Sequence, residues 1–204
     1  MELYTEGCIW LSEREIAYRD AQDTLAVKET IRGNRNAFTS IVEHYTPLIY
    51  SLAFRMLGRK EDAEEETQEI FLKVFKSLKK FNQKKRFYPW LYTIAVNHIR
   101  SCLRKRKHLK KNISYDDEIA APGAFSNSED PNKLMIRREA EKTAGEAIKR
   151  LKPEYREVFV LRQIEGLSVS EAAEILGIPE GTVKSHLYRA RNQLKDYLTK
   201  RGWR

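Results

Sequence analysis

Apolar residues recur at intervals of three and four along most of the chain, which predicts amphipathic helices. The pattern strengthens at Leu25 and runs through Tyr45, with Gly33-Asn34 as the break between two helices. A further apolar stripe starts after Pro47 and ends before Gly58, and we expect proline at the first turn and glycine at the end of that helix. Residues 1–24 are weakly patterned, so we expect a frayed or loosely docked N-terminus.

A longer helical pattern covers residues 61–81. One face is apolar and is expected to be core, comprising Ala63, Thr67, Ile70, Phe71, Val74, Leu78 and Phe81. The opposite face is charged, carrying Asp62, Glu65, Glu69, Lys73 and Lys76, and Leu72 lies among these residues. An apolar residue in a charged stripe is a modest sign of a protein interface, although a single exposed leucine is also ordinary.

The stretch from Pro89 to Lys107 predicts a helix with two unlike faces. Leu91, Ile94, Ala95, His98 and Cys102 form an apolar face. Thr93, Asn97, Arg100 and Arg104 lie opposite, with Trp90 at the edge. Arginine neutralises phosphate, asparagine reads base edges and tryptophan can stack on an unpaired base, so this face has the parts needed to hold nucleic acid. A solvated basic face is the plainer interpretation of the helix alone.

Charge supports a polyanionic partner. The net charge is +9, and the sequence pI is about 9.5. Six of the nine residues from Glu61 to Glu69 are acidic, whereas residues 70–115 contain fourteen lysines and arginines and no acid. The segment between the two helices, residues 82–89, combines basic and aromatic side chains, namely Lys84, Lys85, Arg86, Phe87 and Tyr88. We expect a loop there that suits a strand with splayed bases.

Residues 112–131 are small, acidic and polar without periodicity, and we expect a flexible linker. Helix resumes with Asp130 as N-cap and Pro131 in the first turn, and runs to about Lys152. The sequence therefore predicts an all-α fold of two small helical domains, residues 25–111 and 132–204, joined by residues 112–131.

The second domain carries a helix-turn-helix pattern. A buried helix ends at Gly166, Ser168 or Ser170 caps a short helix, and Gly177 begins the turn into a longer helix from Glu180. The longer helix has an inner apolar stripe and a polar outer face with basic flanks. The outer face comprises Thr182, Ser185, His186 and Arg189, with Lys184 and Arg191 beside it.

The sequence offers no catalytic or metal-binding pattern. Cys8 and Cys102 are far apart, and the four histidines show no ligand spacing, so we expect Cys102 to be a small core residue. We expect neither a cofactor nor a small-molecule substrate. With no run of eighteen apolar residues and no secretory pattern at the start, we expect a cytoplasmic protein.

Four stretches in this order resemble the compact extracytoplasmic-function (ECF) group of sigma factors, members of the sigma-70 family of bacterial RNA polymerase. They are AFTSIVEHYTPLIYSLAFRMLG, DAEEETQEIFLKVFKSLKKF, WLYTIAVNHIRSCLRKRK and LKPEYREVFVLRQIEGLSVSEAAEILGIPEGTVKSHLYRAR. The resemblance covers residues 37–198. It implies a transcription initiation factor, not an enzyme, whose residues 25–111 correspond to region 2 and whose residues 132–204 correspond to region 4.

The resemblance also assigns partners. Region 2 would bind the clamp helices of RNA polymerase core through Asp62, Glu65, Gln68, Glu69 and Leu72. It would capture the promoter −10 element as a single strand through Lys84, Lys85, Arg86, Phe87, Tyr88, Trp90, Thr93, Asn97, Arg100 and Arg104. Region 4 would read the duplex −35 element through Thr182, Lys184, Ser185, His186, Arg189 and Arg191. The polymerase flap region would be a contact besides the clamp helices. A dedicated anti-sigma factor, often membrane-anchored, would hold the protein inactive.

Two other functions remain to be weighed. A stand-alone helix-turn-helix regulator would bind duplex DNA without polymerase, but it usually dimerises, and no dimerisation helix is evident. A metal-dependent nuclease would need carboxylates beside a basic groove, which residues 70–115 lack. The chain departs from the family at Ser101, where an aspartate is common, which leaves the pairing of a nearby arginine open.

Overall fold

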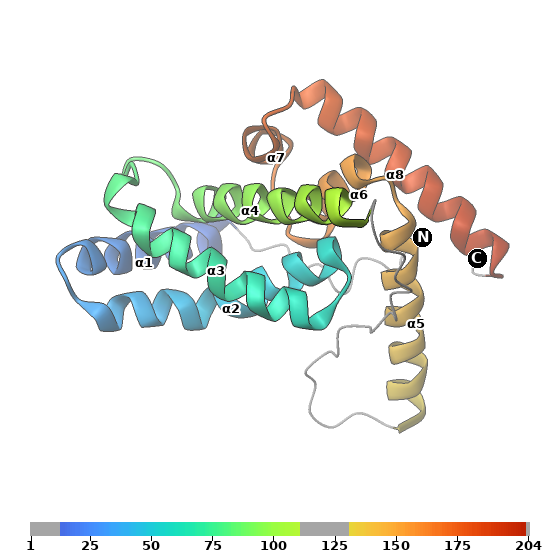
Figure 1. Cartoon of the computed structure of the whole chain (residues 1–204), viewed down its shortest axis with the longest axis horizontal. Helices are drawn as coiled ribbons and strands as arrows, with labels where there is room; N and C mark the ends of the chain where they lie inside the picture. Colours follow the sequence, from blue (N-terminus) through green and yellow to red (C-terminus); the bar gives the residue numbers. More distant parts are fainter. Residues whose placement is uncertain (1–12, 111–130, 203–204) are drawn as a thin grey trace.

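The computed structural model describes residues 13–110 and 131–202, and every regular element in these ranges is helical (Figure 1). The N-terminal elements are α1 (Glu13–Ile31), α2 (Arg35–Leu57), α3 (Lys60–Ser77), a short 3₁₀ turn (Leu78–Lys80) and α4 (Phe87–Lys110). The C-terminal elements are α5 (Pro131–Arg150), α6 (Pro153–Phe159), a π-helical turn (Val160–Ile164), α7 (Val169–Leu176) and α8 (Glu180–Lys200). The expected all-α class is confirmed. None of the described helices combines the length and apolar composition needed to span a bilayer.

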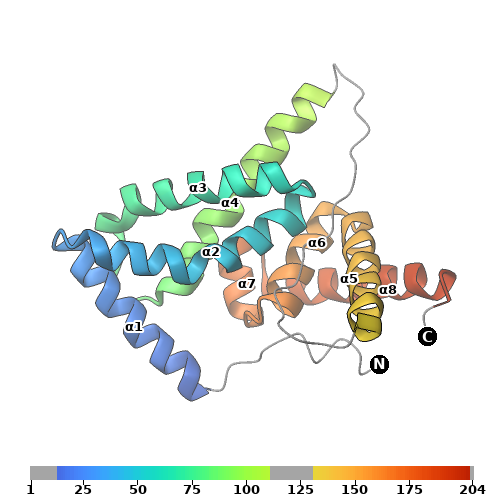
Figure 2. The same ribbon diagram turned by 90° about the horizontal axis from the view of Figure 1, so that it is seen from below.

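The N-terminal helices pack around α2, which contacts α1, α3 and α4 (Figure 2). The apolar face expected for residues 61–81 is buried throughout, and it meets fully buried Tyr45, Ile49 and Leu52 of α2. Burial of this kind contributes about 1.5–3 kcal/mol for each large apolar side chain. The stripe of apolar residues thus fixes which side of α3 faces the core and which side faces outward.

Local signals set most helix ends as expected. The side chain of Asn34 accepts hydrogen bonds from the backbone N–H groups of Asn36 and Ala37 at the start of α2. Gly58 ends that helix with φ of 89°, a left-handed conformation that glycine adopts without strain. Ser168 and Glu171 form a reciprocal capping box at the start of α7.

The expected helix start at Pro47 is wrong, because Pro47 lies inside α2. The apolar stripe explains why the helix continues. Ile41, Tyr45, Ile49 and Leu52 are all buried on one side of it, before and after the proline. The packing of these residues offsets the loss of the one backbone hydrogen bond that proline cannot donate.

The expectation of a loosely docked N-terminus is wrong for residues 13–24, which belong to α1; residues 1–12 lie outside the described residues. Polar contacts replace the apolar stripe that the sequence lacks there. The hydroxyl of Tyr45 donates to Asp23 over 2.5 Å at a buried site. The guanidinium of Arg19 lies 4.4 Å from the centre of the Tyr88 ring.

In the C-terminal part, α7 and α8 form the expected helix-turn-helix, with Gly177 in the left-handed conformation at the end of α7. Val183 and Ala190 of α8 are fully buried, and Ile175 of α7 is nearly so. Small Ala190 lets α8 approach its neighbours closely. The linker expected over residues 112–131 falls almost wholly outside the described residues. Asp130, the expected N-cap of the following helix, lies outside them too.

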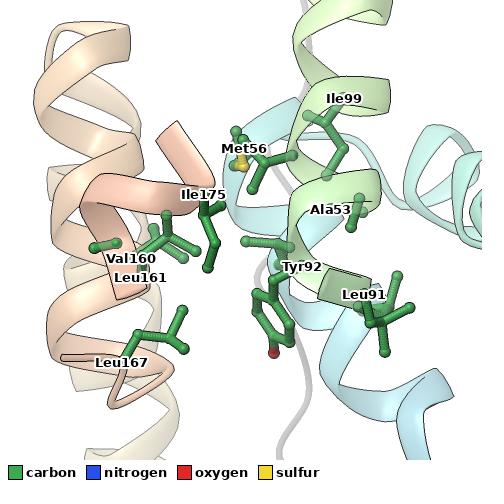
Figure 3. Packing of buried hydrophobic residues seen from close by; sticks show 14 of the residues in the cluster. Ala53, Met56, Leu91, Tyr92, Ile99, Val160, Leu161, Leu167 and Ile175 are labelled. Carbon is green, nitrogen blue, oxygen red and sulfur yellow. The ribbon is translucent and has the colours of Figure 1, made fainter. Parts of the chain in front are cut away.

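The two helical parts pack on one another and share one hydrophobic core. Helix α4 lies between α3 on one side and α7 on the other (Figure 1). Figure 3 shows Ile175 of α7 pointing toward Met56 of α2 and Tyr92 of α4. At the end of α2, Lys149 donates to the Gly58 carbonyl over 2.9 Å, and Arg156 donates to the Met56 carbonyl over 3.2 Å. These cations satisfy carbonyls that a helix end leaves unpaired.

Candidate nucleic-acid interface

The outer face of α8 is open to solvent, as expected. Lys184, Ser185, Arg189 and Arg191 are exposed, whereas Thr182 and His186 are partly buried. The face begins at the N-terminal turn of α8, where short side chains leave room for a base edge. Cationic side chains flank these short residues along the helix, so the arrangement can contact both bases and phosphates.

Neighbouring residues orient two of these side chains. A guanidinium nitrogen of Arg189 donates to the Tyr155 hydroxyl over 3.2 Å, and Arg191 donates to the Gln163 side chain over 2.9 Å. The His186 ring packs edge-on against Tyr155 with 5.2 Å between ring centres. Tyr188, which was not among the residues expected on this face, is 67% exposed on the same helix. Its exposure among basic residues was not visible from periodicity alone.

The second expected DNA surface, on α4, is arranged differently. Asn97 and Arg104 are exposed, Thr93 is partly buried, and the hydroxyl of Ser101 accepts a hydrogen bond from Arg104 over 3.1 Å. Ser101 therefore pairs with an arginine in spite of its departure from the family pattern. The helix is not simply amphipathic, however. Tyr92, Val96 and Ile99 are fully buried because the C-terminal part covers the side away from α3.

Of the aromatic residues expected to stack on bases, Phe87 and Tyr88 lie in the core, and Trp90 packs against it. Phe87 and Tyr88 open α4, and their side chains are 2% and 4% exposed. Trp90 is partly buried, and its ring centre lies 4.8 Å from that of Phe81 and 5.6 Å from that of Phe87. The expected exposed aromatic loop at residues 82–89 is therefore wrong. Aromatic rings next to an apolar core gain more by burial than by exposure. The polar residues 82–85 of the segment, including Lys84 and Lys85, are exposed.

Arg100 is held by the C-terminal part. Its guanidinium binds the Glu157 carboxylate through two hydrogen bonds of 3.0 Å and 2.7 Å, and it donates a third to the Leu176 carbonyl over 3.1 Å. The Glu157 carboxylate raises the pKa of Arg100, and burial lowers it. A two-pronged pair of this kind resembles the way arginine holds a phosphate.

Two more cations of the same surface meet acids of α7. Arg86 donates to Asp20 of α1 over 2.7 Å and to Glu171 of α7. The ammonium of Lys85 lies 2.6 Å from the Glu174 carboxylate, in a pair that is more than half exposed on both sides. Exposed pairs contribute little, so Arg100 and Arg86 are the stronger links between the two parts.

Glu165 lies at the same junction. Its carboxylate accepts a hydrogen bond from the Tyr92 hydroxyl over 2.5 Å, and its backbone carbonyl accepts one from Tyr88 over 3.3 Å. Burial raises the pKa of the Glu165 carboxyl to about 7, against the lowering effects of Tyr92 and Arg55. Burial also raises the pKa of Tyr92, and the neighbouring Glu165 raises it further. The arrangement in which the N-terminal and C-terminal parts pack together, called the packed form below, therefore favours a neutral Glu165 carboxyl.

A third surface lies on α3. Glu65, Gln68 and Glu69 are exposed, and Leu72 is 51% exposed. Asp62 is partly buried, because Arg106 of α4 pairs with it over 2.6 Å. Phe75 was missed by the sequence analysis although it is 50% exposed, one turn after Leu72. Its ring contacts Phe38 with 4.8 Å between centres, so acidic side chains border a small apolar patch.

Comparison with known proteins identifies both parts. The family model of Sigma-70 region 2 matches residues 41–109, and that of Sigma-70 region 4 matches residues 143–194. The chain is 34% identical over 181 residues to the ECF RNA polymerase sigma factor SigW of Bacillus subtilis, covering 84% of this chain and 94% of that protein. It is 33% identical over 181 residues to the RNA polymerase sigma-H factor of Pseudomonas aeruginosa, covering 87% and 94%.

A solved structure shares the fold. The sigma factor RpoE of Bartonella quintana, crystallised with the anti-sigma factor NepR, matches with a TM-score of 0.67 and 26% identity, over 79% of this chain and 96% of that one.

Proposed function

Because the chain belongs to the ECF group of sigma-70 factors, we propose that its three surfaces bind promoter DNA at two elements and RNA polymerase core. The protein is a transcription initiation factor and not a stand-alone regulator. The observation that supports the proposal is that two surfaces with basic side chains, on α4 and α8, are distinct from an acidic and apolar surface on α3. Such separation suits two kinds of partner.

The −35 element is read by α8 in this proposal. Thr182, Ser185 and His186 lie where the helix enters the major groove, and Arg189 is one turn further along. Lys184 and Arg191 contact phosphates on either side. The hydrogen bond from Arg189 to Tyr155 aligns its guanidinium before DNA arrives.

The −10 element is held by α4, through Thr93, Asn97, Arg100 and Arg104, with Lys84, Lys85 and Arg86 on the backbone of the strand. Phe87 and Tyr88 leave this set because they are buried. In the packed form, acids of the C-terminal part already occupy Arg100, Arg86 and Lys85. The two parts must therefore separate before this surface can bind DNA, and binding of polymerase core is the event that separates them.

Core is bound by the α3 surface. Leu72 enters an apolar site on the polymerase clamp helices, while Glu65, Gln68 and Glu69 pair around it and the partly buried Asp62 lies at the edge. Phe75 extends the apolar patch. Region 4 contacts the polymerase flap region. An exposed apolar pair ringed by acids has the composition of a binding hot spot with a polar rim.

An anti-sigma factor controls the protein in this proposal, as in the NepR complex of the Bartonella quintana relative. The protein acts in the cytoplasm, and a membrane-anchored anti-sigma factor would hold it at the membrane. No cofactor or small-molecule substrate enters this function.

The test measures DNA binding by the purified chain with and without polymerase core. The probe is a promoter fork, duplex at −35 and single-stranded at −10, selected from a randomised pool with the holoenzyme. We expect specific binding only when core is present. Arg189→Ala should weaken it by about 1–3 kcal/mol, whereas Lys195→Ala, exposed further along α8, should not. Equally tight specific binding without core would refute the proposal.

A further inference from the structure

Three side chains with different ligand atoms converge between α3 and α4. Glu66 comes from α3, and His98 and Cys102 come from successive turns of α4. Their ligand atoms all lie within 4.8 Å of one another. The Glu66 carboxylate is 2.5 Å from Nε2 of His98, and Sγ of Cys102 is 3.7 Å from the same nitrogen. Such a grouping was not expected from the sequence, because Glu66 is 32 positions from His98 and the pair of residues on α4 matches no known motif.

We propose that Glu66, His98 and Cys102 form a binding site for a divalent transition-metal ion, with zinc as the ion that the donors fit best. A thiolate, an imidazole and a carboxylate together favour zinc over magnesium or calcium, which prefer oxygen ligands alone. Three protein ligands leave a fourth position for water or for another side chain.

Binding needs two adjustments, a wider distance between Glu66 and His98 and the release of Lys73 from Nδ1 of His98. With metal–ligand distances of about 2.0–2.3 Å, neighbouring ligand atoms around a tetrahedral zinc lie roughly 3.3–3.7 Å apart. The sulfur–nitrogen distance of 3.7 Å meets that requirement already. The distance from Glu66 to His98 must widen by about 1 Å. Glu66 is a long side chain that can supply this by rotation, without movement of either helix.

An ion can reach the cluster from solvent. A cavity of about 320 Å³ opens over it, and Glu69, Lys73, Lys105 and Arg106 line it besides the three ligands. Glu69 follows Glu66 by less than one turn and is exposed, so its carboxylate can fill the fourth position or accept a bond from the bound water. Arg106 is already paired with Asp62, which limits its repulsion of a cation.

A cation already contacts the other nitrogen of this imidazole. The ammonium of Lys73 lies 2.5 Å from Nδ1 of His98, so Nδ1 accepts that hydrogen bond and Nε2 carries the proton that is donated to Glu66. When zinc binds Nε2, the imidazole proton moves to Nδ1, Lys73 turns away to solvent, and the Cys102 thiol releases one proton. The ion thus places positive charge on the Nε2 side of the imidazole while the lysine leaves the Nδ1 side.

The site would join α3 to α4 directly behind the acidic surface of α3. Glu66 follows Glu65 and lies three residues before Glu69, two residues that we assign to core binding. A bound ion would fix this stretch of α3 and remove negative charge from it. The metal site itself does not depend on that assignment, and its test uses no polymerase.

The experiment titrates Co²⁺ into the full chain carrying Cys8→Ser, which removes the other cysteine. Cobalt reports its ligands by colour: a thiolate gives a sulfur-to-cobalt charge-transfer band, and a four-coordinate site gives intense visible bands. We expect one ion per chain with both signals, and competition by zinc. Adding Cys102→Ser should abolish the charge-transfer band, and Glu66→Gln and His98→Gln should each weaken affinity by about a hundredfold or more, since even outer-shell changes cost about 10–100-fold.

Circular dichroism with each titration shows whether a variant keeps its helices. Glu66→Gln preserves size and can still accept a hydrogen bond, so it decides the question even where His98→Gln unfolds the domain. Zinc should also raise the thermal unfolding midpoint of the Cys8→Ser chain but not of the chain with Glu66→Gln added. A Cys8→Ser chain that shows no charge-transfer band, or an unchanged cobalt affinity in Glu66→Gln, would overturn the proposal.

Discussion

The link between Arg100 and Glu157 offers a quantitative test of the packed form. Glu157 is 11% exposed and Arg100 is 28% exposed, and two hydrogen bonds of 3.0 Å and 2.7 Å join them. Hydrogen bonds to charged groups contribute about 1.5–3 kcal/mol. Glu157→Gln removes the charge but leaves one acceptor oxygen, so we expect a loss of about 1–2 kcal/mol from the packed form.

A less stable packed form should bind the −10 strand more tightly. When only the separated form binds the −10 strand, the apparent dissociation constant is the intrinsic one divided by the fraction of separated protein. A shift of about 1–2 kcal/mol therefore tightens binding by about 5- to 30-fold while the packed form predominates. The assay is fluorescence anisotropy of a labelled −10 strand, without core, at fixed low salt.

The control is Glu154→Gln on the same helix. Glu154 is exposed, so this substitution makes the same change in net charge without touching the junction. We expect less than a twofold change from it. Equal gains in the two variants would show that net charge alone controls binding, and no gain in Glu157→Gln would show that the packed form does not restrict the −10 surface.

Three further outcomes are expected. Burial raises the pKa of Glu165 to about 7, so the neutral carboxyl stabilises the packed form fully below the ordinary pKa of 4.5, and this stabilisation is lost as the pH rises through 7. Binding of the −10 strand should therefore strengthen between these pH values. Glu165→Gln should abolish this pH dependence. Tyr45→Phe deprives buried Asp23 of its donor and should cost about 1–3 kcal/mol, read as a lower thermal midpoint, whereas an unchanged midpoint would mean that the bond contributes nothing net. Leu72→Asp should prevent co-migration with polymerase core at unchanged helical content; retained co-migration would remove this residue from the core-binding surface.

Periodicity and turn chemistry predicted the helical class, the helix-turn-helix and most helix ends, because those features depend on neighbouring residues. The apolar face of α3 and the glycine at 58 are examples. Helix α1 was missed at residues 13–24 because polar residues such as Asp23 attach it, and a polar contact leaves no periodic apolar signal. The helix start predicted at Pro47 is wrong because buried residues before and after it stabilise one continuous helix α2.

The candidate sites show the same division. The helical period predicts which residues of α8 face outward. Which residues of α4 are exposed depends instead on contacts with segments distant in sequence. Arg100 is a residue type that commonly binds phosphate. Only the fold shows that its guanidinium is already hydrogen-bonded to Glu157, 57 positions away. Likewise, Tyr92 can be assigned to a buried junction only after the C-terminal part is seen to cover it.

The acids at the junction of the two parts act as internal counterions for the −10 surface. When DNA replaces Glu157, Glu171 and Glu174, those carboxylates take up cations from solution while the DNA releases its own. The two ion exchanges oppose one another. Salt also weakens the packed form, so added salt frees the basic surface at the same time as it screens that surface from DNA. The salt dependence of −10 strand binding by the free chain is therefore shallower than the number of its phosphate contacts alone would give.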